Sequence, residues 1–288
     1  MQPTIVTRSL EAPGATITYD VRGDLGAGVP LLLIGSPMDA AGFATLAGHF
    51  DDRPVVTYDP RGTGRSPRSD GHGEITPDEH AGDLARIVDA IGGGPVDVMA
   101  SSGGAVNALA WVAARSEQVR TLVAHEPPLV TALPDREAVA AAIEQMHRTY
   151  HRAGLGPAMA QFILLVQYDG ELPEGYRFPQ VDPAQFGLPS EDDGRRDDPL
   201  LGQNLRGCTG YEPDWAALRS AGTRIVAARG ADSRRTLPAR GAEALAQLIG
   251  AELAVFPGDH AGFLGGEYGM HGKPDAFAAR LREVLAAA

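Results

Sequence analysis

The sequence has few of the residues on which several common protein classes depend. Its 288 residues include one cysteine, Cys208, and one lysine, Lys273. A single cysteine excludes an internal disulfide and a cysteine-based zinc site, and it suits a reducing compartment. The chain contains no G-x-G-x-x-G dinucleotide fingerprint and no G-K-[ST] phosphate-binding motif. We therefore expect neither a metal nor a nucleotide cofactor.

Positive charge and long apolar runs are also scarce. The chain has 37 acidic and 25 basic residues, which gives a net charge of −12. Nucleic acids and anionic membrane surfaces bind clustered positive charge, so neither is an expected partner. No apolar run approaches the ~20 residues of a membrane span, and residues 1–10 lack the apolar segment of a signal peptide. These absences predict a cytoplasmic protein with a small-molecule substrate, and they leave a homodimer open.

What the sequence does contain is an alternation of short apolar runs with helical patterns. A hairpin is expected at 9–22, about a Pro13-Gly14 turn. Apolar runs typical of buried strands follow at 30–34, 54–59, 96–99, 119–124, 224–228 and 252–256. Helical spacing occupies 40–50, 76–91, 105–114, 237–248 and 274–287. This order predicts an α/β fold with a mostly parallel central sheet and helices on both faces.

The alternation breaks at about residue 131 and resumes at 217. Helical patterns cover 139–150 and 158–168, whereas 169–212 is rich in Pro, Gly, Asp and Arg and has little periodicity. We interpret 131–216 as a mainly helical cap inserted into a core formed by 1–130 and 217–288.

The most informative stretch runs from Val96 to Val106. A short apolar strand is followed by Ser101-Ser102-Gly103-Gly104 and then by a helix. This is the layout of a nucleophile elbow, a strained strand-to-helix turn that exposes a serine and requires small residues two positions before and after it. Ala100 and Gly104 meet that requirement around Ser102, whereas centring the turn on Ser101 would place the bulky Met99 there. We therefore predict Ser102 as the nucleophile, with a plain βα turn as the alternative.

Three further motifs join the elbow in a resemblance to the α/β-hydrolase fold family that covers essentially the whole chain. Gly35-Ser36-Pro37 resembles the oxyanion loop, usually His-Gly-x-Pro, and the segment from Asp59 to Ser66 is similar to D-x-R-G-x-G-x-S. Gly258-Asp259-His260 follows the final strand, where the family places its histidine. Together, at these spacings, the four motifs predict an α/β-hydrolase fold.

The resemblance implies a catalytic triad in the order serine, acid, histidine. Ser102 is its nucleophile, and His260 can accept the proton near neutral pH. For the acid, Asp232 after the 224–228 strand is preferred, although the usual Gly-x-x-Asp spacing holds only if Arg229 stands at the glycine position. Glu126, which ends the strand after the elbow, is the alternative.

The same resemblance implies an oxyanion hole made by the backbone N–H groups of Ser36 and Gly103. Pro37 has no N–H to donate, and Ile34 replaces the histidine that usually precedes the glycine. Met38, Phe162 and Phe263 are the expected walls of the substrate pocket, although core packing would give the same pattern.

These features predict an esterase-like serine hydrolase that acts on a small, largely apolar ester or related carbonyl compound. A serine nucleophile argues against the dehalogenases and most epoxide hydrolases of this fold, which use aspartate. The alternatives are a C–C hydrolase or cofactor-free perhydrolase with the same triad, and a ligand-binding relative without activity.

Overall fold

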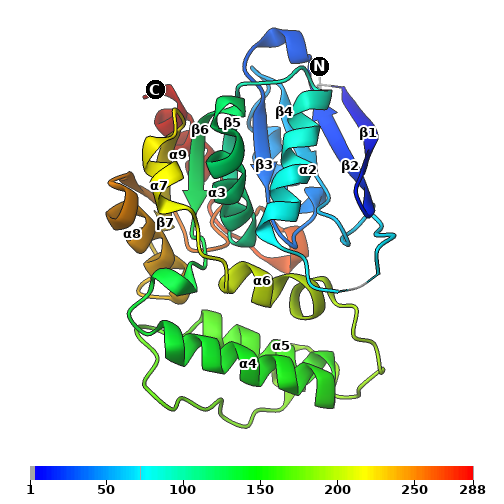
Figure 1. Cartoon of the computed structure of the whole chain (residues 1–288), viewed down its shortest axis with the longest axis vertical. Helices are drawn as coiled ribbons and strands as arrows, with labels where there is room; N and C mark the ends of the chain where they lie inside the picture. The colour runs from blue at the N-terminus through cyan, green and yellow to red at the C-terminus, as the bar shows by residue number, and fades with distance from the viewer. Residues whose placement is uncertain (1–3, 72, 288) are drawn as a thin grey trace.

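The computed structural model describes residues 4–71 and 73–287, and an eight-stranded sheet forms the centre of this part of the chain (Figure 1). The strands are β1 (Ile5–Ala12), β2 (Ala15–Arg22), β3 (Leu31–Ile34), β4 (Val55–Tyr58), β5 (Val96–Ser101), β6 (Val119–His125), β7 (Arg224–Gly230) and β8 (Glu252–Phe256). They are ordered β1-β2-β4-β3-β5-β6-β7-β8. The predicted hairpin is confirmed as β1 and β2, and it begins four residues earlier than expected.

The direction of the strands places the loops that carry the predicted site residues at one edge of the sheet. The β1–β2 and β2–β4 pairs are antiparallel. All the other neighbouring pairs, from β4–β3 to β7–β8, are parallel. The loops that follow β3, β5, β6 and β7 therefore leave from the same side. These loops carry Ser36, Ser102, Glu126 and Asp232, respectively.

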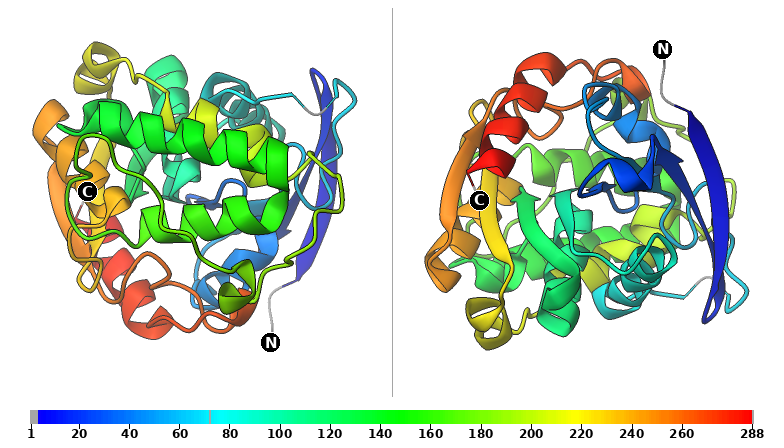
Figure 2. Two further views of the ribbon diagram at one scale, coloured as in Figure 1. Left: turned by 90° about the horizontal axis from the view of Figure 1, so that it is seen from below. Right: turned by 90° about the horizontal axis from the view of Figure 1, so that it is seen from above.

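Helices cover both faces of the sheet, as predicted (Figure 2). One apolar cluster packs α2 (Pro77–Ala90), α3 (Gly103–Arg115) and α7 (Trp215–Ser220) on one face. A second cluster packs α1 (Ala44–Gly48) and α9 (Pro274–Ala286) on the other. The remaining core helix, α8 (Leu237–Ile249), follows β7. At the start of α2, Glu79 N donates to Thr76 Oγ1 and Thr76 N donates to Glu79 Oε2, a reciprocal cap that stabilises the first turn.

The helix expected at 40–50 is the exception. The structure forms a 3-10 turn, η2 (Ala40–Phe43), followed by the five-residue α1. Gly42 explains part of the break, because glycine is a poor helix former and this one packs against Met38. A Cβ at Gly42 would lie 2.4 Å from Met38 Sδ.

The inserted segment lies across the carboxyl ends of the parallel strands (Figure 1). It contains α4 (Arg136–Ala153), α5 (Leu155–Val166) and α6 (Leu205–Thr209), with the short turns η4 (Val130–Ala132), η5 (Pro183–Phe186) and the π-helical η6 (Pro199–Asn204). An apolar cluster that includes Val139, Met146 and Leu165 holds these elements together, and Leu237 of α8 also belongs to it. The division into core and cap at residues 131 and 216 stays a prediction.

Candidate active site

Ser102 stands at the turn between β5 and α3 in a strained backbone conformation. Its φ is 57° and its ψ is −130°, in the left-handed region that non-glycine residues rarely adopt. The Ser102 N–H donates to His125 O at 2.9 Å, which ties the turn to the end of β6. A hydrogen bond between neighbouring elements thus holds the strain, as is common at functional sites.

The two glycines after Ser102 are required by close backbone contacts. A Cβ at Gly103 would lie 2.7 Å from Ser36 O, and a Cβ at Gly104 would lie 2.7 Å from Ile34 O. Both distances are shorter than any ordinary contact of a methyl group, so neither position accepts a side chain. The start of α3 is consequently pressed against the loop that follows β3.

His260 is held by Glu126. The His260 Nδ1 and Glu126 Oε2 atoms lie 2.7 Å apart, and the other carboxylate oxygen accepts from Gly230 N at 2.8 Å. Glu126 is completely buried, and His260 is partly exposed. The pair leaves His260 Nε2 available on the side of the ring away from the carboxylate. No hydrogen bond joins that atom to Ser102 Oγ in this structure, and such contacts often form only when substrate is bound.

Glu126 remains ionised despite its burial. Burial alone would raise the pKa of this carboxyl, but the hydrogen bond from His260 and the neighbouring His125 ring lower it to about 2. A buried carboxylate beside an imidazole fixes the ring tautomer and stabilises the imidazolium that forms when the ring accepts a proton.

The predicted pairing of Asp232 with His260 is wrong in this structure. Asp232 Oδ2 instead accepts from Lys273 Nζ at 2.7 Å, and both side chains are more than half exposed. The Asp232 backbone N–H bonds Gly258 O, so the loop after β7 carries the side chain outward. Gly230 N, at the end of β7, donates to one oxygen of the Glu126 carboxylate, and the other oxygen contacts His260. The carboxylate on the histidine is therefore that of Glu126, the alternative acid.

A second serine–histidine pair lies next to the first. Ser101 Oγ and His125 Nδ1 are 3.1 Å apart, and both residues are buried. The His125 ring is nearly parallel to that of His260, with centroids 6.0 Å apart. Neither Ser101 nor His125 lines the cavity onto which Ser102 opens. Their bond therefore connects the ends of β5 and β6 at the residues that precede Ser102 and Glu126.

The buried His125 predicts a particular pH dependence of stability. Burial lowers its pKa to about 4, whereas an unfolded histidine titrates near pH 6.5. Between these values the unfolded chain binds more protons, so the free energy of unfolding falls as the pH falls. We expect this residue to contribute ~2 kcal/mol to the loss between pH 7 and pH 4.5. Urea unfolding at the two pH values should show a correspondingly smaller loss in His125→Asn, and equal losses would contradict the assignment.

The two backbone N–H groups predicted for the oxyanion hole, those of Ser36 and Gly103, lie in neighbouring segments of the chain. Gly103 directly follows Ser102, and the loop carrying Ser36 lies against it. Within residues 4–71 and 73–287, the N–H groups of Ser36 and Gly103 donate to no other group of the protein. Both residues also line the cavity at Ser102.

The cavity itself has a volume of about 390 Å³ and lies between the sheet edge and the inserted segment. Ser102, His260 and Ser36 line its core side. Its other walls are mainly apolar and come from α4, α5, η6, α6 and α8: Ile143, Phe162, Ile163, Leu165, Val166, Leu200, Leu205 and Leu237. No Asp, Glu, Lys or Arg side chain is among the residues that line it.

Of the three predicted pocket walls, the structure places Phe162 on this cavity but not Met38 or Phe263. Phe263 is buried in the core, stacked on Phe43 with ring centroids 5.3 Å apart. Met38 packs on Gly35 and Gly42. The sequence prediction missed Cys208, which lines the cavity and whose Sγ lies 3.4 Å from a Cβ placed at Gly103. Burial raises the pKa of this thiol to about 12, so it stays protonated.

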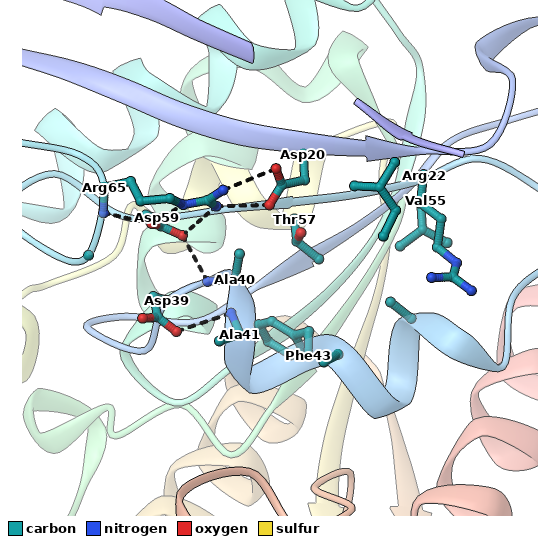
Figure 3. A pocket seen from close by; sticks show the side chains of 14 residues that line it. Asp20, Arg22, Asp39, Ala40, Ala41, Phe43, Val55, Thr57, Asp59 and Arg65 are labelled. Carbon is teal, nitrogen blue, oxygen red and sulfur yellow. Dashed lines mark hydrogen bonds and ion pairs between the residues drawn. The ribbon is translucent and has the colours of Figure 1, made fainter. Parts of the chain in front are cut away.

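A second cavity, of about 450 Å³, lies between β2 and η2 and contains no part of this serine–histidine arrangement (Figure 3). Three of its charged groups, Asp20, Asp59 and Arg65, are paired with one another, whereas Arg22 Nε is buried without a hydrogen-bond partner in the described part of the chain. Arg65 donates to Asp20 and to the buried Asp59, which also accepts from Ala40 N. Ser66 Oγ donates to Asp59 O and accepts from Thr18 N. The 59–66 motif thus fixes the loop after β4 and has no direct part in the site at Ser102.

Neither a metal centre nor a membrane-crossing helix is found in the part of the chain that the structure describes. Those residues contain no group of three or more His, Cys, Asp or Glu side chains that could hold a metal ion. His147 and His151 contact each other on α4 without a third ligand, with ring centroids 4.4 Å apart. No helix among the same residues is long and apolar enough to span a bilayer.

Comparison with known proteins agrees with this architecture. A model of the alpha/beta hydrolase fold family matches residues 31–160. The chain is 30% identical over 296 residues to the uncharacterized hydrolase YraK of Bacillus subtilis (strain 168), with 98% of this chain and 97% of that protein aligned. The chain therefore belongs to the α/β hydrolase fold family, as its motifs predicted.

Solved structures share the fold over almost the whole chain. A thermophilic esterase from Thermogutta terrifontis superposes with a TM-score of 0.67 at 18% identity, over 99% of this chain and 98% of that one. An alpha/beta hydrolase from Sphaerobacter thermophilus gives a TM-score of 0.62 at 22% identity, over 96% of this chain and 99% of that one. At these identities the similarity concerns the fold alone.

Proposed function

We propose that the protein is a serine hydrolase that cleaves small, uncharged, largely apolar esters. One observation carries the proposal: Ser102 on its strained turn and His260 on a buried carboxylate open onto the same apolar cavity. A serine hydroxyl needs a base and an oriented imidazole to act as a nucleophile near neutral pH. This arrangement supplies both.

In the first half of the proposed reaction, Ser102 Oγ attacks the ester carbonyl carbon while His260 Nε2 accepts the hydroxyl proton. The carbonyl electrons move to its oxygen, and the Ser36 and Gly103 N–H groups donate to the negative charge. Each such donor contributes roughly 3 kcal/mol in known enzymes. Collapse of the intermediate breaks the bond to the alkoxy group, which leaves with the proton from His260 as an alcohol. The acyl group remains on Ser102.

In the second half, a water molecule replaces the alcohol. His260 takes one proton from this water, and the resulting oxygen nucleophile attacks the acyl carbon. The intermediate then releases Ser102 Oγ, which recovers its proton from His260, and a carboxylic acid leaves. Glu126 remains a carboxylate throughout and holds the ring orientation in both halves.

The cavity walls limit the substrate by charge and by size. A charged group entering this apolar space would lose its hydration without gaining a partner, because no oppositely charged side chain lines the walls. The volume of about 390 Å³ is near the lower end of the ~300–1,000 Å³ typical of small-molecule sites. We therefore expect short or medium acyl chains on an uncharged alcohol.

A fluorophosphonate probe tests the proposal directly. The probe should label the wild-type protein, and the label should persist in Ser101→Ala and disappear in Ser102→Ala. Hydrolysis of p-nitrophenyl esters of graded chain length then measures the acyl preference. Absence of both labelling and hydrolysis would instead support a ligand-binding member of the family, the alternative from the sequence.

The position of Phe162 predicts an effect on chain-length preference. Phe162 projects from α5 onto the cavity, so the larger ring of Phe162→Trp should shorten the acyl chain that fits. We expect kcat/KM for octanoate esters to fall about tenfold while acetate turnover changes less than twofold, since ~1–3 kcal/mol is typical of a one-methylene mismatch. p-Nitrophenyl acetate and octanoate measure both. A parallel fall would mean that Phe162 acts through packing of the inserted segment.

A further inference from the structure

A separate hollow of about 1010 Å³ lies on the opposite side of the α4–α5 helix pair. Residues of α4, α5 and the 177–182 loop line it. Ile143 faces the cavity at Ser102, whereas Arg152 faces this hollow, nine residues along the same helix. At ~100° per residue, nine positions turn the helix by ~180°. A molecule in the hollow would therefore be separated from Ser102 by the helix layer.

Three arginines surround the hollow without a carboxylate partner. Arg148 and Arg152 stand one helical turn apart on α4, and Arg177 comes from the loop opposite. Arg177 Nη1 donates to the adjacent Tyr176 O at 3.1 Å. Across residues 4–71 and 73–287, none of the three forms an ion pair.

Two carboxylates on neighbouring elements are already paired with other arginines. Glu144 pairs with Arg206, and Asp192 pairs with Arg196. Asp182, the acidic residue that lines the hollow, accepts from the Ala184 N–H at the start of η5. The chain carries twelve more acidic than basic groups, 37 against 25, so carboxylates are abundant. The lining of the hollow contains three arginines against the one carboxylate of Asp182, and this excess of positive charge in an acidic protein indicates an anionic occupant.

The chemistry of arginine narrows that occupant. A guanidinium presents planar, paired N–H donors that match phosphate oxygens, and three of them surround this space. Phe178, Pro157 and Val181 add apolar surface beside the charges, and Gln161 Oε1 is buried without a hydrogen-bond partner in the described part of the chain. The hollow thus offers positions for an anion, an apolar moiety and one hydrogen-bond donor. We propose that it binds a small molecule that carries a phosphate or diphosphate group.

Isothermal titration of the full chain with inorganic pyrophosphate at low ionic strength tests this site. We expect saturable binding to the wild type and at least tenfold weaker binding to the Arg148→Gln/Arg152→Gln variant, because charge-assisted hydrogen bonds contribute strongly. Arg8→Gln/Arg136→Gln is the matched control. It removes the same charge from two exposed arginines that line no part of the hollow, and its affinity should stay within twofold of the wild type.

Three outcomes would overturn the site: no saturable binding to the wild type, equal weakening in both double variants, or equal affinity for malonate, a dicarboxylate. Circular dichroism and thermal melting confirm that both variants are folded. Hydrolysis of p-nitrophenyl butyrate should be the same in both, since the substitutions lie across the helix layer from Ser102. Because pyrophosphate binding is measured without turnover, this test is independent of the proposed esterase activity.

Discussion

Ser102→Ala and His260→Ala are each expected to lower ester turnover by about 10³-fold or more while leaving the fold intact. Removing the hydroxyl removes the atom that attacks, and removing the imidazole removes the base that takes its proton. The two groups act as a unit, so the double variant should be little worse than either single one. Initial rates with p-nitrophenyl butyrate measure all three variants against the wild type.

Ser101→Ala provides the control one residue away. It deletes a buried hydroxyl that bonds His125 and leaves the cavity lining unchanged. Its loss of activity should be tens of fold at most, through slight movement of the elbow. Near-normal turnover in a folded Ser102→Ala protein, combined with an inactive Ser101→Ala, would transfer the nucleophile to Ser101 and contradict the mechanism.

The elbow could be recognised from the sequence because the residues of the turn, Ser102, Gly103 and Gly104, are consecutive. The contacts that forbid a side chain at the two glycines come from Ile34 and Ser36, at the end of the neighbouring strand β3, and they are not visible in the sequence. A strained turn of this kind tolerates few residue types, so the pattern is specific. The alternation of strands and helices was readable for the same reason, since each period reports the burial of its own segment.

The acid partner could not be read in this way. Asp232 and Glu126 both follow parallel strands at the same sheet edge, so spacing alone leaves both available. What separates them is side-chain direction: Glu126 has φ 50° and points inward beneath Gly230, whereas Asp232 reaches the exposed Lys273. A positive φ at a glutamate is not visible in a sequence.

The pocket walls depended on the least periodic part of the chain. The α4 and α5 helices were predicted, but the η6 turn and α6 that complete the cavity lie in or beside the segment expected to be loop. Phe263 was predicted to line the pocket and does not. It lies three residues after His260, yet its ring packs on Phe43 in the core. Proximity in sequence to a catalytic residue did not determine which way the side chain faces.

Glu126→Gln is expected to lower turnover by about 10³- to 10⁴-fold with little change in overall structure, since the equivalent change in a serine protease triad has an effect of that order. The amide has nearly the shape of the carboxylate, but it lacks the negative charge that stabilises the imidazolium. It can also present an N–H to His260 Nδ1 and so favour the wrong tautomer. Because the pKa of Glu126 is about 2, the wild-type carboxylate stays charged across the pH range of assay.

Asp232→Asn is the matched control, because it makes the same carboxylate-to-amide change on the neighbouring loop. It breaks only an exposed ion pair with Lys273, and such pairs contribute ~0–1 kcal/mol. Its kcat and KM should both stay within about twofold of the wild type, since the side chain lines no part of the cavity. Activity of both variants is measured from pH 5 to 9, so that a displaced profile is not mistaken for lost turnover. If Asp232→Asn loses the greater activity, the acid is Asp232 and the loop after β7 must turn inward when substrate binds.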